Sequence, residues 1–563
     1  MKALFVLALV GCSAGTPGPG IAVDRAMAHA RTLVELGPRV AETAVAKSAA
    51  AYVGEHLPRA SRAHVGTVEV PAIEVLGSVY RRAHTLHTTD PNLVARFGPA
   101  TGRALLLMAH YDSARGSPGA VDNAAAVGVL LELGRMLAVA PPPYPVIVAI
   151  TAREEDGLVG AEALAASLGA EVDIAIAFDL VGGDGELVIN GASTMIGAAE
   201  LRWLAVAADR AGVTVRMPLA HRVISRWWPL AERSDHGAFT RRGIRALHLY
   251  HRGHDGELID RAYHSPRDRY ERIERASVDE LGRFVVALVA KRPPPYAGDG
   301  FWVPQLANVV VPRWSLVAAE VVLLLVTALA LVRMRRDRAR GGAGLLAGIA
   351  CTVVAFASVL FLERVALAYP LAWLHTPGLH VIAEALVLVG VLGLATRLVA
   401  RRTPWIGARR YLVVAIALLV AFGVALLAIG AAELAWIWLV PAACASFAPF
   451  VGRARAVVLV PTLLPALLVL DPAQLREIAW NGFAPAAVPL VAWLALVGMP
   501  PLAAAAYALR ARHPAGPLGA FVLPVGWALS IALGSTLIVR ASPPCSASQF
   551  SELHLGCEMR SGV

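Results

Sequence analysis

Hydrophobic and polar positions divide the chain into two parts of different character. From residue 21 to residue 291, short apolar runs bounded by Gly, Pro or charged residues alternate with helix-like stretches, which is the pattern of an α/β domain. We expect buried strands at 104–109, 146–151, 174–178, 186–190 and 244–249, and helices at 123–137 and 199–211. A polar linker rich in Pro and Gly follows at 293–312.

After the linker, apolar stretches recur with lengths that suit a membrane-spanning helix. They lie at 315–332, 344–361, 380–396, 411–430, 435–451, 456–470, 485–506 and 517–539. The pattern predicts an all-α, multi-pass transmembrane domain of about eight helices over 313–540, and the fifth and sixth stretches are short. Residues 541–563 remain as a C-terminal tail, in which Cys545 and Cys557 could be bonded or free.

Arginines follow the first, third, fifth and seventh apolar stretches, whereas the intervening loops carry few basic residues. By the positive-inside rule the arginine-rich loops are cytoplasmic, so the residues before 313 and after 540 lie outside. The N-terminus, MKALFVLALVGC, has a short apolar run that predicts an export signal within residues 1–20. Its end resembles a bacterial lipobox in which Cys12 would be acylated; an ordinary signal is the alternative. We therefore expect a multi-pass cell (inner) membrane protein with its first domain on the exterior or periplasmic side.

Composition supports this picture. Apolar residues make up 57% of the chain and charged residues 16%, against roughly a quarter charged in typical soluble domains. The net charge of +10 comes with arginines in short runs between apolar segments, so the expected partner is the lipid bilayer and not nucleic acid. The oligomeric state is left open. The five cysteines include no CxxC pair, so any metal must be held by His, Asp and Glu.

Candidate site residues with imidazole or carboxylate side chains lie mostly at the ends of the predicted strands. They are His110 and Asp112, Asp122 at the start of a helix, Glu154 and Glu155, Asp179, and far downstream His264. The carboxyl ends of strands in an open α/β sheet converge on one crevice, where these groups would repel one another without cations. A zinc pair suits mixed imidazole and carboxylate ligands, with one carboxylate bridging the ions and another, outside the metal shell, accepting a proton from water.

Residues 25–292 resemble the M28 family of zinc peptidases. The resemblance is carried by GPRVAETAVAKSAAAYV at 37–53, HYD at 110–112, GAVDNAA at 119–125, TAREEDGLVGA at 151–161, FDLVG at 178–182, SDHGAF at 234–239 and YHSPRD at 263–268. It implies a three-layer α/β/α domain with a mixed central sheet. With the multi-pass tail, the whole architecture is similar to the endoplasmic-reticulum and vacuolar membrane metallopeptidases.

The resemblance also implies a role for each candidate residue. His110 and Asp179 would bind one zinc ion, Glu155 and His264 the other, and Asp122 would bridge them. Glu154 would be the general base for the metal-bridging water, and Asp112 would orient the imidazole of His110. His236 would help to hold the substrate.

The sequence thus predicts a membrane-anchored di-zinc metallopeptidase, an aminopeptidase that cleaves near the ends of extracytoplasmic peptides. One alternative is a glutaminyl-cyclase-like acyltransferase with a single zinc, which the retention of both metal half-sites disfavours. The other is a transporter or scaffold whose outer domain only binds. Few charges lie in the predicted spans, and Glu320 and Glu384 are the intramembrane candidates for a function of the tail.

Overall fold

The computed structural model describes residues 20–75, 78–81, 83–192, 195–216, 234–252, 262–296, 300–303, 309–333, 408–428, 431–452, 455–463 and 465. The chain divides into two compact units. We call Met1–His254 with Ile259–Pro312 the sheet unit, and Asp255–Leu258 with Arg313–Val563 the helical unit. The predicted export signal with Cys12, Glu384, most of the predicted spans and the C-terminal tail lie outside the described residues.

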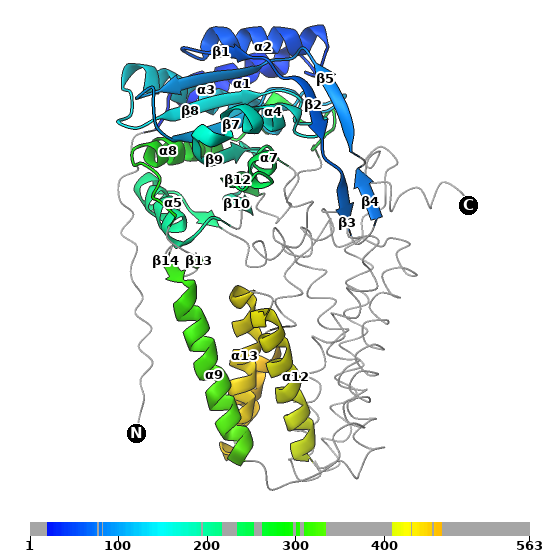
Figure 1. Cartoon of the computed structure of the whole chain (residues 1–563), viewed down its shortest axis with the longest axis vertical. Coiled ribbons are helices and arrows are strands. Elements are labelled where there is room, and N and C mark those ends of the chain that lie inside the picture. Colours follow the sequence, from blue (N-terminus) through cyan, green and yellow to red (C-terminus); the bar gives the residue numbers. More distant parts are fainter. Residues whose placement is uncertain are drawn as a thin grey trace, which may run out of the picture. The chain divides into compact units, whose positions relative to one another are not determined.

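A mixed sheet forms the centre of the sheet unit (Figure 1). Its described strands run in the order β1-β6-β8-β7-β9-β12-β10-β11. Their bounds are β1 (Ser61–Ala63), β6 (Asn92–Phe97), β7 (Ala104–His110), β8 (Val146–Thr151), β9 (Val172–Phe178), β10 (Glu186–Ala192), β11 (Val215–Arg216) and β12 (Arg245–Arg252). The neighbours β8, β7, β9 and β12 are parallel, while β6 and β10 pair antiparallel with β8 and β12. The predicted α/β class with a mixed sheet is confirmed, and all five predicted strands are present.

Helices cover both faces of this sheet because the strands are apolar on both sides. In β7, Leu105 and Leu107 belong to one buried cluster, and Leu106 and Met108 belong to another. The first cluster includes residues of α1 (Val23–Glu35), α2 (Ala44–His56), α3 (Ala125–Val139), α5 (Ala198–Ala211) and α8 (Arg275–Val289). The second includes residues of α4 (Val159–Leu168) and α7 (His236–Thr240). A fully apolar strand such as β7 is typical of a sheet buried between two helical layers.

Several short strands were not expected from the sequence. β2 (Gly66–Val70) pairs antiparallel with β5 (His84–Thr88), and β3 (Ile73–Val75) with β4 (Ser78–Arg81). Within the predicted linker, β13 (Gly300–Val303) pairs antiparallel with β14 (Val309–Pro312). In β2 only alternate residues are buried, so its signal is weaker than that of the uniformly apolar strands.

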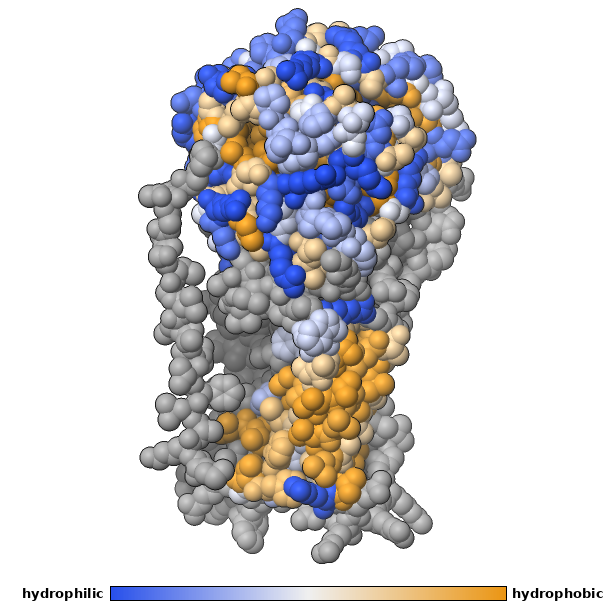
Figure 2. Space-filling view, turned by 60° about the vertical axis from the view of Figure 1, so that its left-hand side comes forward, coloured by the Kyte–Doolittle hydropathy of each residue, from blue (hydrophilic) through white to orange (hydrophobic). Residues whose placement is uncertain are grey.

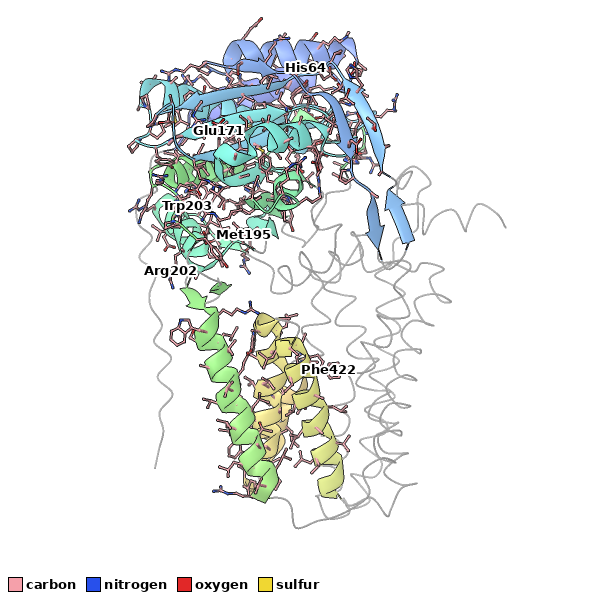
Figure 3. The ribbon with its side chains drawn as sticks, in the orientation of Figure 1. His64, Glu171, Met195, Arg202, Trp203 and Phe422 are labelled. Carbon is pink, nitrogen blue, oxygen red and sulfur yellow. The ribbon has the colours of Figure 1, made fainter. Side chains whose placement is uncertain are left out.

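The described part of the helical unit contains α9 (Arg313–Arg333), α12 (Ala408–Ala428), α13 (Ala432–Ser446) and α14 (Arg455–Leu459). Both α9 and α12 pack against α13. Phe422 of α12, labelled in Figure 3, stacks on Trp438 of α13 with ring centroids 4.6 Å apart. A side chain at Gly423 would collide with Leu439, so glycine allows α12 to approach α13 closely.

α9 is the one helix among the described residues that is long and apolar enough to cross a membrane. Its large apolar side chains are exposed, with Val322 at 57% and Leu325 at 64%, whereas Glu320 and Thr327 are buried. In Figure 2 the described surface of the helical unit is mostly hydrophobic. This arrangement is the reverse of a water-soluble helix bundle, in which polar side chains face outward.

Candidate metal centre

Parallel pairing brings the ends of three central strands to one edge of the sheet. His110 at the end of β7 is in register with Thr151 at the end of β8. β9 runs parallel to β7 and ends at Phe178, one residue before Asp179. The side chains that follow these strands therefore emerge close together, as expected at the carboxyl edge of an α/β sheet.

A first group gathers around His110, which is almost fully buried. Its Nε2 atom lies 3.2 Å from Asp122 Oδ1 and 3.3 Å from Asp179 Oδ1. The three potential ligand atoms all lie within 4.8 Å of one another. This spacing allows one metal ion to contact all three residues.

A second group gathers around His264 and shares Asp122 with the first. His264 Nε2 lies 2.9 Å from Glu155 Oε2 and 3.3 Å from Asp122 Oδ2. The two oxygens of Asp122 therefore face different histidines, so this carboxylate can serve both groups at once. His110, Glu154 and Glu155 form a third combination with ligand atoms within 4.8 Å.

These groups fit divalent metal ions chemically. Imidazole nitrogens and carboxylate oxygens are ligands that zinc accepts in tetrahedral sites. Glu155 Oε1 is buried and has no hydrogen-bond partner among the described residues. A buried carboxylate oxygen without a partner is costly, and a cation at this position would satisfy it.

Attraction between the two histidines and the nearby carboxylates determines the direction of the pKa shifts in the site. Burial lowers the pKa of His110, but its contacts with Asp112, Asp122 and Asp179 outweigh burial and raise that pKa well above its usual range. Burial likewise lowers the pKa of His264, yet Asp122 and Glu155 raise it to about 10. Burial raises the pKa of Asp122, and the two histidines reverse this shift and lower it.

Glu154 and Glu155 are positioned by Asp112. The Asp112 carboxylate accepts the backbone N–H groups of Glu154 and Glu155, each at 3.1 Å. Its Oδ1 atom lies 3.6 Å from His110 Nδ1, which is longer than a hydrogen bond. Asp112 therefore lies beside His110, whose Nδ1 atom is 3.2 Å from the Asp112 backbone oxygen, while its carboxylate binds the loop that carries the two glutamates. Burial raises the pKa of the Glu154 carboxyl well above its usual range.

Asp122 lies on an irregular turn, although the sequence predicts a regular helix from residue 123. Ala120–Ala124 forms a π-helical turn in which Asp122 and Asn123 have non-helical dihedral angles, and α3 begins at Ala125. Asn123 Nδ2 donates a hydrogen bond to the backbone oxygen of Phe178 at 2.8 Å. This side-chain contact joins the turn to the end of β9, and Asp122 on the turn faces both histidines.

Three buried residues next to the site were not singled out from the sequence. The Asp268 carboxylate accepts the backbone N–H groups of Val121 and Asp122, and burial raises its pKa to about 6. Asp235 accepts a 2.5 Å hydrogen bond from Thr151 Oγ1, and burial raises its pKa to about 7. Arg39 is fully buried. Each lies in one of the motifs at 37–53, 234–239 and 263–268. A charged residue inside such a motif was the feature of the sequence that could have identified it.

His236 is fully buried at the start of α7. Its ring stacks on that of His248, with centroids 5.5 Å apart. It is not among the residues whose ligand atoms converge. A direct contact with substrate is therefore still a prediction.

Residues 92–289 match the model of peptidase family M28. Aminopeptidase YwaD of Bacillus subtilis (strain 168) is 28% identical over 191 residues, which are 32% of this chain and 39% of that protein. The uncharacterized protein YfbL of Escherichia coli (strain K12) is 38% identical over 104 residues, or 16% of this chain and 32% of that protein. The chain thus spans less than two-fifths of the length of either relative.

Solved structures resemble about half of the chain at lower sequence identity. BSAP, a zinc aminopeptidase from Bacillus subtilis, is 16% identical with a TM-score of 0.39, covering 47% of this chain and 94% of that one. A glutaminyl cyclase from Bacteroides thetaiotaomicron is 17% identical, also with a TM-score of 0.39, covering 49% of this chain and 99% of that one.

Proposed function

We propose that this chain, whose residues 92–289 match peptidase family M28, is a membrane-anchored di-zinc aminopeptidase. The observation that carries the proposal is the sharing of Asp122 between two ligand groups, His110 with Asp179 and Glu155 with His264. Two groups joined by one carboxylate suit two ions and not one, because each oxygen of Asp122 faces a different histidine. The aminopeptidase named among the curated relatives supports the choice of substrate.

Each residue has one chemical task in this proposal. His110, Asp179 and Asp122 would hold one zinc ion, and Asp122, Glu155 and His264 the other. When bound, the zinc pair supplies Lewis acidity that polarises the peptide carbonyl and acidifies water. Glu154 would accept a proton from the attacking water and pass it to the leaving amine. Asp112 keeps Glu154 and Glu155 in place through their backbone N–H groups.

Membrane anchoring is supported by α9. Exposed Val322, Leu325 and Leu329 would contact lipid, while Glu320 and Thr327 are buried within the protein. Polar residues of membrane helices face the interior in this way, because lipid offers them no hydrogen bonds. We extend the proposal to the multi-pass tail and to an exterior sheet unit, on the arginine pattern of the loops.

The test uses the full chain purified in detergent. Elemental analysis should find two zinc ions per chain, and peptides with a free N-terminus should be hydrolysed while N-acetylated copies of the same sequences are not. An N-terminal glutaminyl peptide separates the alternatives: one zinc per chain with pyroglutamyl formation would replace the proposal by an acyltransferase. A chain with neither metal nor turnover would be a binding protein.

A further inference from the structure

The segment Ser117–Asp122, which ends in the shared carboxylate, is held on one side by a buried arginine. Arg39 donates to four backbone oxygens, at 2.5 Å to Pro118, 2.8 Å to Gly119, 2.6 Å to Tyr111 and 3.2 Å to Leu33. The guanidinium is fully buried and has no carboxylate partner among the described residues. Its N–H groups donate instead to carbonyl groups after the end of β7 and in the segment that leads to Asp122.

Gly119 is required for this approach. Its φ of 65° lies in the left-handed region, and a Cβ there would lie 2.6 Å from Arg39 Nη2. Only glycine allows both the backbone conformation and the close contact. Gly119 therefore allows the segment to lie directly against the Arg39 guanidinium.

Asp268 holds the same segment by its N–H groups. Its carboxylate accepts from Val121 N at 2.8 Å and from Asp122 N at 3.1 Å, and its backbone oxygen accepts from Ala120 N at 3.3 Å. Asp268 is 1% exposed and follows His264 by four residues. One turn of the chain thus supplies a ligand to the second group and fixes the backbone of the shared residue.

We propose that Arg39 and Asp268 form a two-sided clamp that fixes the direction of the Asp122 carboxylate and so lets it serve both metal ions. Arg39 binds the carbonyl groups of the segment and Asp268 binds its N–H groups, so the segment cannot rotate without breaking hydrogen bonds to a charged partner. Both are positioning residues, because neither side chain reaches a proposed ligand atom. This inference rests on the zinc pair proposed above.

The clamp predicts a defect in metal affinity, not only in stability. Asp268→Asn keeps the side-chain shape but turns an NH2 group toward one of the two N–H donors. We expect zinc affinity at both sites to fall about 10–100-fold, as is typical when residues that orient metal ligands are changed. Arg39→Lys keeps the charge but cannot donate to four carbonyls, and should give the same defect. Affinity is measured by competition with a chromogenic chelator, using the full chain in detergent.

A matched control separates positioning from folding. Glu200 is also fully buried, accepts a backbone N–H from Gly197 at 2.9 Å and pairs with Arg245. Arg245 is the first residue of β12, which runs parallel to β9, so it lies at the strand end opposite to the one that Asp179 follows. Glu200→Gln should lower the melting temperature of the metal-free protein at least as much as Asp268→Asn, with zinc affinity unchanged. The absorption spectrum of the cobalt-substituted protein should change in the clamp variants and not in the control.

The outcomes distinguish the clamp from the function on which it rests. A wild-type chain that binds no zinc would overturn both. A wild-type chain that binds two zinc ions, with Asp268→Asn and Arg39→Lys binding them equally well and giving an unaltered cobalt spectrum, would overturn the clamp alone.

Discussion

Glu154 and Glu155 are neighbours in the chain, and both donate their backbone N–H to Asp112. Their side chains nevertheless have different partners, because Glu155 Oε2 lies 2.9 Å from His264 Nε2, whereas Glu154 forms no ion pair among the described residues. At the scale of the residue, a single peptide bond separates the proposed metal ligand from the proposed proton carrier. Substitutions at these two positions should therefore have different signatures.

Glu154→Gln should lower turnover about 10²–10⁴-fold, the usual cost of losing a general base, while zinc stays bound. The amide keeps the size of the side chain but cannot accept the proton. Peptide hydrolysis and elemental analysis of the same preparation check both parts. Glu171→Gln is the control, since Glu171 is an exposed partner of Arg96. If the Glu154→Gln protein lost zinc, Glu154 would be the metal ligand and Glu155 the general base.

His110→Ala and His264→Ala should each reduce zinc content, because the two histidines face opposite oxygens of Asp122. His64→Ala, at an exposed position, should retain full zinc content. Elemental analysis after dialysis is the measurement. Retention of one zinc per chain, unaffected by His110→Ala, would favour a single-metal enzyme.

The meeting of side chains was predictable where a motif placed a charged residue at a strand end, as for His110 and Asp179, whose zinc-binding roles remain proposals. Residues that hold the backbone in place were not predictable from the sequence. Arg39 and Asp268 act through main-chain atoms, and a sequence pattern does not show which backbone groups will lack partners. Asp112 was expected beside the imidazole, where it lies, but its carboxylate also accepts hydrogen bonds from the glutamate loop, which is close only after β7 and β8 have paired.

At the scale of the element, the strands were predictable to the extent that they are uniformly apolar. β7 and β8 are buried along their whole length and lie where the sequence predicts them. The turn Ala120–Ala124 was not predictable, since its apolar residues continue the period of α3 and the irregularity depends on Asn123 reaching the end of β9. A helical pattern reports which face is apolar but not where the first turn departs from regular geometry.

On α8, Glu280 provides a test of stability against pH. Burial is the main cause that raises its pKa to about 7, against 4.5 ordinarily, and Arg283 only partly opposes this. The folded state therefore holds this proton more tightly than the unfolded state, so stability is lost as pH rises from about 4.5 through 7. Glu280→Gln should be stabilised by about 1–2 kcal/mol at pH 8, allowing for partial exposure, and unchanged near pH 4.

Thermal unfolding of the full chain in detergent at the two pH values measures this difference. Glu271→Gln on an exposed turn should show none. Equal stabilisation of Glu280→Gln at both pH values would mean that ionisation of the carboxylate is not the cause.

At the scale of the whole molecule, the two units differ in the kind of side chain that they bury and expose. The sheet unit buries apolar strands between helices, whereas α9 exposes its apolar residues and buries Glu320. If the helical unit lies in lipid, as proposed, one part of the chain folds against water and the other against lipid. The arginines that separate the apolar stretches after residue 313 are the feature of the sequence that predicts this division.

This separation predicts which side of the membrane each unit faces. In a variant whose native cysteines at 12, 351, 444, 545 and 557 are replaced, single cysteines are introduced at Val139, which is 79% exposed on the sheet unit, and at Arg336, in the first arginine-rich loop. A membrane-impermeant thiol reagent added to intact cells or sealed right-side-out vesicles should label Val139→Cys but label Arg336→Cys only after permeabilisation.

Cys545 or Cys557, retained singly, should be labelled like Val139→Cys, because an even number of spans returns the tail to the side of the sheet unit. Labelling of Arg336→Cys with Val139→Cys protected would invert the topology. The proposed substrate would then be a cytoplasmic peptide, although the metal centre and its chemistry would be unchanged.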